Sequence, residues 1–440
     1  ILFFTKLIPQ ITINKNQASK SSSVVSSPAK YSLTAAFIIC FISIMFSGIA
    51  SMLMSVYLPV AVKDLLGNVR EEKMNNVGAY INSVFIFGSM FGGFAWGFIC
   101  DRTGRSKAVI LSTALYGLFM MLTAFPSSWL MVGIYRFITG FGVVGVMVTT
   151  NILIAELWPE KKRAIALGIV SAAMPVGFIA AGAMNNILSD WHLAFLTGSV
   201  PIAIAIVAIL ILPESSSWKN NKQKTGINHR FIDKLFDQGY KKNLVSGSVI
   251  FGAMLIGLWA VFSWAPTWIQ SITGNDAKAK DLRGLTMMVL AISGLGGSVV
   301  SGWIANAIGL RKTMMICFAA CFIMTFVVFK LNTAVSSSTF IEMGILAFFF
   351  GISQGALSVY IPQLFPTVIR ASATGFCFNI GRLFTATVVF FIGALVSFLD
   401  GYGNAVFIFS FIFLIGLATT YFSKEQTKAE AAALHAAFAE

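Results

Sequence analysis

Long blocks of apolar residues separated by short polar loops dominate the pattern along this chain. Twelve blocks are distinguishable, at about 35–62, 77–100, 108–126, 129–157, 164–188, 193–213, 243–270, 284–305, 313–329, 339–365, 371–398 and 404–422. Most reach the roughly 20 residues with which a helix crosses a hydrocarbon core of about 30 Å. The core of a bilayer contains no water that could hydrogen-bond to unpaired backbone N–H and C=O groups, so we expect each block to form a helix. The pattern therefore predicts an all-α membrane protein with twelve transmembrane helices.

A long polar stretch at 214–242 divides the apolar blocks six and six. We therefore expect two six-helix bundles, at 32–213 and 243–423, joined by a central loop at 214–242. Polar tails are expected at 1–31 and 424–440, with residues 1–30 disordered and no cleaved signal peptide.

Two sequence landmarks recur in both halves. Residues 97–107 read GFICDRTGRSK and residues 302–312 read GWIANAIGLRK. Residues 156–168 read ELWPEKKRAIALG, and residues 363–375 read QLFPTVIRASATG. The offsets are nearly equal, which indicates a duplicated bundle with pseudo-symmetric halves, an arrangement typical of transporters that work by alternating access.

Composition and charge support the membrane interpretation and orient the chain. Only 11% of residues are charged and the mean hydropathy is +0.82, whereas soluble domains are nearer a quarter charged. With both termini inside, 22 of the 31 Lys and Arg residues fall in cytoplasmic segments and seven in the opposite loops. This bias predicts cytoplasmic termini in a cell membrane. It also explains most of the net charge of +14, so no nucleic-acid partner is implied.

The chain lacks the usual signatures of an enzyme. It has no Gly-Lys-Ser/Thr phosphate loop, and its three histidines are too scattered for a metal cluster or catalytic triad. The five cysteines lie in or beside apolar blocks and are interpreted as packing residues. We expect no enzymatic activity, no cofactor and no bound metal.

The first landmark also carries a family resemblance. Gly97, Asp101, Arg102, Gly104 and Arg105 form a Gly-x-x-x-Asp-Arg-x-Gly-Arg pattern. It resembles the best-known signature of the major facilitator superfamily, and the resemblance covers about residues 32–423. The second copy departs from it, with Asn and Leu at two signature positions.

Two further stretches resemble one branch of that superfamily. LPESSSW at 212–218 is similar to the Pro-Glu-Ser-Pro-Arg motif of sugar porters and metabolite:proton symporters, and Glu156 with Arg163 resembles the Glu–Arg loop of the same branch. The resemblance implies a major facilitator fold, with a binding site near the membrane midplane between the halves.

The charged loop residues are candidates for gating. Asp101 is expected to accept bonds from the N–H groups at a neighbouring helix N-terminus. Arg105 and Arg163 are expected to pair with Glu156 and Glu214. Such contacts would hold the cytoplasmic face closed; alternatively, these charges only obey the positive-inside rule. The predicted gating set is Asp101, Arg102, Gly104, Arg105, Glu156, Arg163, Glu214, Arg311 and Arg370.

Three charges fall inside the predicted spans, where charge is costly and usually functional. By the repeat offset, Arg136 and Glu342 occupy nearly equivalent places in the fourth and tenth spans. A contact between them could form an outer gate or a proton-sensitive switch, and Glu342 is the candidate proton-coupling residue. The alternatives are a buried structural pair, or a Glu342 that reaches the outer water.

Arg382, near the middle of the eleventh span, is the main candidate for binding substrate. Asn379, Arg382 and Thr385 form one polar stripe on an otherwise apolar helix. A guanidinium keeps its charge and suits a carboxylate or phosphate, so the stripe indicates an anionic substrate. The alternative is a structural arginine that neighbouring carbonyls satisfy. The full set of predicted substrate-binding residues is Arg382, Arg136, Asn379, Thr385, Asn151, Gln354 and Trp264.

Together these features predict a monomeric secondary transporter in the lipid bilayer. The preferred substrate is a small organic anion, a monocarboxylate or sugar acid, moving with protons or another coupling ion. The first span carries no acid to couple protons, so a facilitator also remains open. The alternatives are a neutral sugar or polyol porter, a drug or metabolite exporter, and a nutrient sensor that does not transport.

Overall fold

The computed structural model describes residues 30–215, 218–219, 238–274, 278–365 and 370–423. Within these ranges, 12 helical spans are long and apolar enough to cross a membrane. The predicted all-α class and twelve spans are confirmed. Residues 1–29 of the predicted N-terminal tail at 1–31, the predicted C-terminal tail at 424–440 and most of the central loop lie outside the described residues.

The first six spans comprise eight helices. These are α2 (Lys30–Leu66), α3 (Glu71–Thr103), α4 (Arg105–Leu122), α5 (Trp129–Leu157), α6 (Glu160–Ser171), α7 (Ala173–Ile187), α8 (Trp191–Leu196) and α9 (Ser199–Ile211). Prolines explain why the fifth and sixth spans are interrupted. Pro175 and Pro201 have no N–H to donate to the carbonyls of Ser171 and Thr197, where α6 and α8 end.

The last six spans comprise nine elements. These are α12 (Gln238–Thr273), α13 (Lys278–Ile308), α14 (Leu310–Phe326), η1 (Val327–Leu331), α15 (Ser337–Gln363), α16 (Arg370–Phe390), α17 (Ile392–Phe398), α18 (Tyr402–Ser410) and α19 (Ile412–Phe422). The helices begin earlier than the predicted apolar blocks in several places. Helix α2 already begins at Lys30, and α12 begins at Gln238, inside the predicted central loop. Helices α3 and α13 each begin six residues before their predicted blocks. Helical hydrogen bonding extends into polar residues that an apolar count leaves out.

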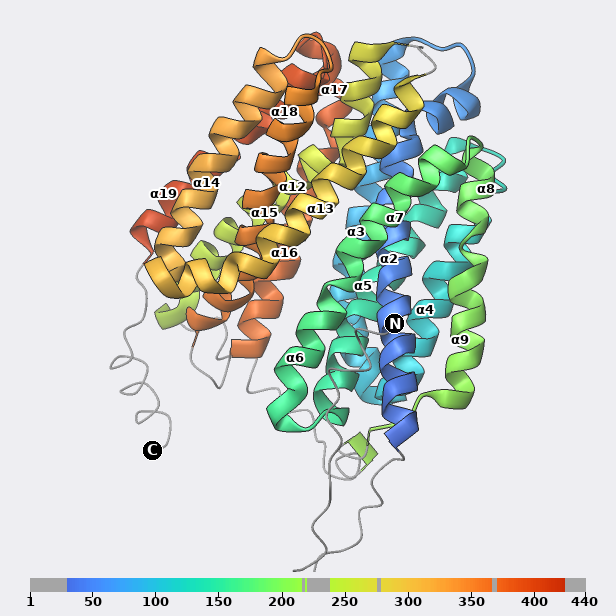
Figure 1. The fold of residues 1–440 in the computed structure, drawn as a ribbon, viewed down its shortest axis with the longest axis vertical. Helices are drawn as coiled ribbons and strands as arrows, with labels where there is room; N and C mark the ends of the chain where they lie inside the picture. The colour runs from blue at the N-terminus through green and yellow to red at the C-terminus, as the bar shows by residue number, and fades with distance from the viewer. Residues whose placement is uncertain (1–29, 216–217, 220–237, 275–277, 366–369, 424–440) are drawn as a thin grey trace, which may run out of the picture.

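Figure 1 shows α2–α9 as one bundle and α12–α19 as another, side by side. The ribbons approach each other at the top of the view and separate towards the bottom. We call the lower face, which carries the turns at Gly104 and Gly309, the motif face. The upper face, with the turns at Gly67 and Gly401, is the distal face.

Glycines allow close helix packing within each bundle. A Cβ on Gly177 of α7 would lie 2.0 Å from the Met45 carbonyl of α2, and one on Gly351 of α15 would lie 1.9 Å from the Gly294 carbonyl of α13. Small residues are what lets membrane helices approach this closely. These contacts hold each bundle together as a unit.

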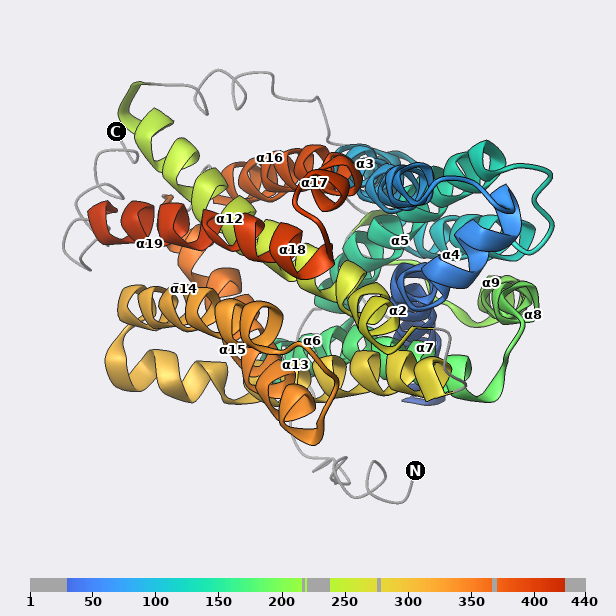
Figure 2. The same cartoon turned by 90° about the horizontal axis from the view of Figure 1, so that it is seen from above.

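The two bundles meet mainly along four pairs of helices. In both views, α7 lies beside α13, and α3 lies beside α16 and α17, with α2 against α12 at the centre. Figure 2 shows this arrangement from above. The candidate residues on α3, α12 and α16 therefore lie at or near the boundary between the bundles.

Candidate functional site

Arg382 lies near the middle of α16 and faces the interior of the protein. The strongly exposed Phe384 of the same helix lies about 200° around the helix axis from it, at about 100° per residue. The side chain is half-buried, and Nη1 donates to Asn379 Oδ1 at 3.1 Å. Among the described residues, no carboxylate lies within ion-pair distance of its guanidinium. Arg382 is thus an inward-facing cation held by one neutral amide.

Asn379 joins Arg382 to the other bundle. It is buried, and its Oδ1 lies against Gly93 of α3, where a Cβ would approach to 2.1 Å. Thr385, the third residue of the predicted stripe, is fully buried, and its hydroxyl donates to Gly381 O of its own helix. Gly381 packs on Gly252 of α12. The structure therefore brings Asn379 and Arg382 together but turns Thr385 into the packing of the second bundle.

The predicted contact between Arg136 and Glu342 is absent from the described conformation. Arg136 is 1% exposed, donates to Ala50 O at 2.6 Å and Ser51 O at 3.3 Å, and lies 4.1 Å from the Phe85 ring centroid. Glu342 instead accepts a bond from Asn332 Nδ2 at 2.6 Å, in the turn before α15. Each charged side chain has its partners on the nearest helix or turn, although Arg136 Nε has no hydrogen-bond partner in the described structure. The predicted direct pair is therefore not formed in this conformation.

The remaining predicted binding residues are Trp264, Asn151 and Gln354. Trp264 is fully buried and stacks on Tyr402 with centroids 5.5 Å apart. Asn151 and Gln354 are half-buried, and each has one buried amide atom, Oδ1 and Nε2 respectively, without a hydrogen-bond partner in the described structure. Unpaired buried amide atoms cost free energy unless water or a ligand meets them, so both remain binding candidates.

A set of contacts across the boundary closes the distal face, and we call it the distal seam. Tyr402 Oη donates to Asn75 Oδ1 at 2.5 Å, and Asn185 Nδ2 donates to Lys280 O at 2.6 Å. Lys280 Nζ reaches Ser189 Oγ at 2.9 Å. Hydrogen bonds between the two bundles, where the structure describes them, belong to this seam. The described conformation is therefore closed at the distal face.

Beside the distal seam lies Arg283, one of the seven Lys and Arg residues that were expected in the loops opposite the cytoplasm. Arg283 is the sixth residue of α13 and only 5% exposed. The available signal was helical periodicity, because Arg283 shares a buried face with Met287 and Leu290. The loop assignment was wrong because the apolar block was placed at 284–305, whereas α13 begins six residues earlier, at Lys278.

One titratable group outside the spans has a shifted pKa. Asp190 caps α8, and its carboxylate accepts a bond from the backbone N–H of His192 at 2.9 Å and contacts the His192 ring at 3.0 Å. The backbone bond first, and the ring contact second, lower the pKa of Asp190. His192 also lies 3.7 Å from Asp64 at the end of α2, so this cluster fastens α8 to α2.

On the motif face, the first landmark forms a charged network within the first bundle. Arg105 pairs with Asp101 through Nη1 and with Glu156 through Nε, both at 3.0 Å. Glu214, not Asp101, caps the next helix: its Oε1 accepts the backbone N–H groups of Arg105 at 2.8 Å and Ser106 at 3.2 Å. The expected capping role of Asp101 was therefore wrong, because Glu214 reaches the start of α4 from the end of α9.

The other predicted gating residues are more loosely connected. Arg102 lies 4.0 Å from the Phe98 ring centroid. Arg163 has a buried Nε without a hydrogen-bond partner among the described residues, so its expected pairing with Glu156 or Glu214 is not formed. Arg311 donates to Thr420 O at 3.1 Å within the second bundle. Arg370 begins α16, but its side chain lies outside what the structure describes.

Glycine conformation supports the duplication of this landmark. Gly104 has φ of 107° and Gly309 has φ of 91°, at the two offset-matched turns. Non-glycine residues rarely adopt such angles. Gly104 is also crowded, since a Cβ there would lie 2.4 Å from Glu214 Oε2.

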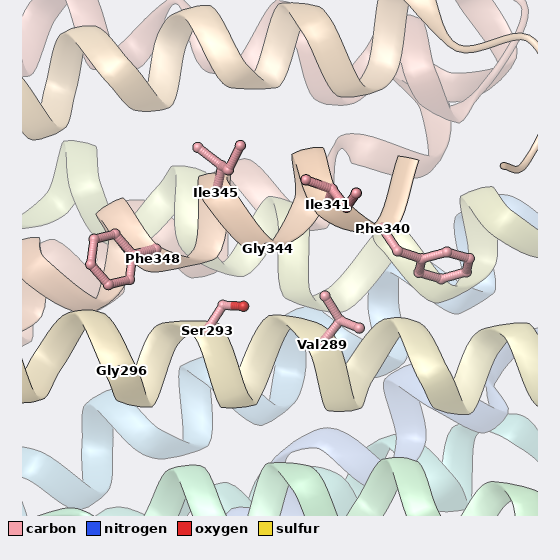
Figure 3. Close-up of a pocket in the computed structure, with 8 residues that line it drawn as sticks. All are labelled: Val289, Ser293, Gly296, Phe340, Ile341, Gly344, Ile345 and Phe348. Atoms are coloured by element: carbon pink, nitrogen blue, oxygen red, sulfur yellow. The ribbon is translucent and has the colours of Figure 1, made fainter. Parts of the chain in front are cut away.

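A separate apolar groove lies between α13 and α15, with a volume of about 530 Å³ (Figure 3). Ser293 is its one polar side chain among the labelled residues, and Ile341 and Ile345 on its wall are 65% and 41% exposed. Residues this apolar and exposed in membrane spans face lipid. The groove has no charged group to bind an anion, and we do not assign it to substrate.

Comparison with known proteins identifies the family. The family model described as Major Facilitator Superfamily matches residues 37–386. The chain belongs to this superfamily. The family resemblance predicted from the loop motif is confirmed, and the protein is a membrane transporter and not an enzyme.

Several curated relatives match most of the chain. The cis,cis-muconate transport protein of Acinetobacter baylyi is 26% identical, with 82% of this chain and 87% of the relative covered. The probable 4-methylmuconolactone transporter of Cupriavidus pinatubonensis is 25% identical, covering 74% and 76%. The sialic acid transporter NanX of Escherichia coli is 24% identical, covering 76% and 81%.

Solved structures support the fold. The xylose transporter XylE from E. coli, described as inward open, gives a TM-score of 0.75 at 17% identity, covering 91% of this chain and 99% of XylE. A bacterial homologue of the lysosomal transporter Spinster, described as inward-facing and unoccupied, gives 0.74 at 15% identity, covering 90% and 97%. At these identities the likeness concerns the fold alone.

Proposed function

We propose that this protein is a secondary transporter of small organic anions, and that Arg382 binds the anionic group between the two bundles. The observation that carries the proposal is the state of Arg382 itself. It is an inward-facing, half-buried guanidinium whose described partner is a neutral amide. Holding a cation inside a membrane protein is costly without a counter-charge, and a carboxylate substrate would supply one.

The names of the relatives support an organic acid as the substrate class. They include transporters of cis,cis-muconate and sialic acid, and a benzoate transport protein from A. baylyi. Asn151 and Gln354 are the proposed neutral contacts, because each has an unpaired buried amide atom.

We further propose that the motif face is cytoplasmic and that the anion enters together with protons. The Lys and Arg bias of the loops supports the orientation, with a plasma-membrane location and cytoplasmic termini. An anion entering a cell moves against the membrane potential at a cost of about 2.3 kcal/mol per charge per 100 mV. Moving it with at least one proton removes that cost. Glu342, which accepts a hydrogen bond from Asn332, is the proposed proton-coupling residue.

The motif-face residues are proposed to gate by changing partners. In the described conformation, Arg105, Asp101 and Glu156 bind one another within the first bundle. When the motif face closes, the second bundle would approach this network. Asp101 is 71% exposed and therefore available for a new contact.

The decisive experiment is a binding screen on the purified protein and on Arg382→Gln. Thermal stabilisation is measured with cis,cis-muconate, benzoate, sialic acid, xylose and an organic amine. A carboxylate should stabilise the wild-type protein and not Arg382→Gln, because ligand binding raises the stability of the folded state. Thr385→Val is the matched control, since its hydroxyl bonds only to its own helix in the described contacts.

The screen also separates the competing functions. Equal stabilisation of the wild-type protein and Arg382→Gln by xylose would replace the anion proposal with a neutral sugar porter. Stabilisation by the amine alone would favour an exporter of cationic compounds. Counterflow of labelled carboxylate in liposomes then distinguishes a transporter, which exchanges substrate, from a sensor, which binds without exchange.

A further inference from the structure

Beside the distal seam lies Arg283, which has no acidic partner among the described residues. Arg283 is 5% exposed, and its Nη1 donates to the neutral side chain of Gln270 on α12. Its Nε is buried and has no hydrogen-bond partner in the described part of the chain. Asp281, two residues away, is exposed on the opposite side of α13.

Contacts around Arg283 place it at the boundary between the bundles. The next residue, Gly284, packs against the first bundle, where its Cβ would lie 2.6 Å from the Gly182 carbonyl of α7. Helix α13 also contacts α2 of the first bundle. The exposed Ile292 lies about 180° around α13, so Arg283 points away from the lipid-facing side.

Burial of Arg283 depends on which face of the transporter is closed. Its covering includes α2 and α7, which belong to the opposite bundle. In alternating access, the bundles separate at one face while they close at the other. Opening of the distal face would therefore hydrate Arg283 and expose its unpaired guanidinium N–H donors to the incoming solute.

We propose that Arg283 forms a second anion-binding site, an outer capture site for the carboxylate substrate, available when the distal face is open. This inference rests on the proposed anion function. A cation on the wall of a water-filled approach attracts an anion before it reaches the midplane. On closure, the substrate moves on to Arg382, and Arg283 returns to Gln270.

The test compares transport with binding, using labelled cis,cis-muconate and benzoate as probes. In right-side-out membrane vesicles, Arg283→Gln should raise the KM for uptake from the distal side by about tenfold, a modest steering effect. Raising the salt concentration should raise the wild-type KM but have little effect on that of Arg283→Gln. The Kd of the purified protein, measured with the distal seam closed, should stay within about twofold of wild type, because Arg283 is buried there.

Two variants make the result specific. Arg283→Lys keeps the charge and should restore most of the wild-type KM. Lys330→Gln removes a distal-face cation that bonds to Asn404 away from the seam, and should leave the KM unchanged. A purely structural role would change kcat and KM together without rescue by lysine.

Failure of this inference is distinguishable from failure of the proposed function. An unchanged uptake KM in Arg283→Gln, or a Kd that rises as much as the KM, overturns the outer site. Loss of affinity in Arg382→Gln at the same time leaves the anion proposal intact. If neither carboxylate binds the wild-type protein, both proposals fail.

Discussion

Arg136 and Arg382 are two intramembrane arginines with the same chemistry and different surroundings. Both fall in apolar blocks, and both were predicted to bind substrate. The fork of Arg136 is used by the Ala50 and Ser51 carbonyls of α2, whereas Arg382 has one amide partner and an accessible surface. The sequence identifies such residues because a charge inside an apolar span has a high free-energy cost, but the carbonyls that bond to them belong to a neighbouring helix. That neighbour is known only once the helices are packed.

This difference gives a prediction for Arg136. Arg136→Lys keeps the charge but loses the planar fork and its position 4.1 Å from the Phe85 ring centroid. We expect the free energy of unfolding to fall by about 2 kcal/mol, the usual contribution of hydrogen bonds to a charged group. Thermal unfolding should show a lower midpoint, while the Kd for the carboxylate stays unchanged. Arg102→Lys, at an exposed site, should alter neither quantity, and a large rise in the Kd of Arg136→Lys would return Arg136 to the binding site.

At the scale of helices, the contact between α3 and α16 links bundle packing to the binding site. Gly93 leaves the space that Asn379 fills, and Asn379 in turn holds Arg382. The apolar pattern predicted both helices and the polar stripe on α16. It could not predict that Thr385 packs inside the second bundle, on the side of α12. The three polar residues of the stripe lie at different angles around α16, and only the packed structure shows which of them the second bundle covers.

Gly93→Ala should therefore weaken substrate binding without unfolding the protein. The new Cβ would meet the tip of the Asn379 side chain, which can rotate away, so the helices need not separate. Loss of the bond that orients Arg382 should raise the Kd by about fivefold to tenfold, equivalent to the roughly 1–1.5 kcal/mol of one net hydrogen bond. Gly97→Ala, one turn along on an open part of α3, is the control. Equal Kd values for Gly93→Ala and wild type would show that Asn379 does not orient Arg382.

The two duplicated turns provide a matched pair at the same scale. Alanine at either Gly104 or Gly309 must adopt a strained backbone, at a cost of about 1–3 kcal/mol. At Gly104 the new Cβ also displaces Glu214 from the start of α4, adding about 1 kcal/mol for a lost cap. Gly104→Ala should thus lower the thermal midpoint more than Gly309→Ala. Equal losses would mean that Glu214 contributes little to the stability of the first bundle.

For the whole molecule, the repeat predicted two bundles but not the face at which they meet. Both facings satisfy the same apolar pattern, because alternating access requires the residues at each face to suit a closed and an open state. Arg283 is the clearest case: its charge suited a loop, but it is 5% exposed in the closed conformation. A sequence that must be compatible with two packings leaves the choice between them to small differences in free energy.

Gly182 offers a way to change that choice. A Cβ at Gly182 would lie 2.6 Å from the backbone carbonyl oxygen of Gly284 across the boundary. Neither atom can rotate away as the end of a long side chain could, so the clash must be relieved by separating α7 from α13. Gly182→Ala should therefore disfavour the closed distal face and increase the population with the distal face open.

Spin labels at Glu72 and Asp400, exposed on the distal ends of the two bundles, would report a longer distance in this variant. The five native cysteines are buried, which favours labelling at the introduced positions. Gly177→Ala is the control, because its clash with Met45 lies within the first bundle and is present in both facings. It should lower stability without lengthening the labelled distance, and an unchanged distance in Gly182→Ala would contradict a two-state seam at this contact.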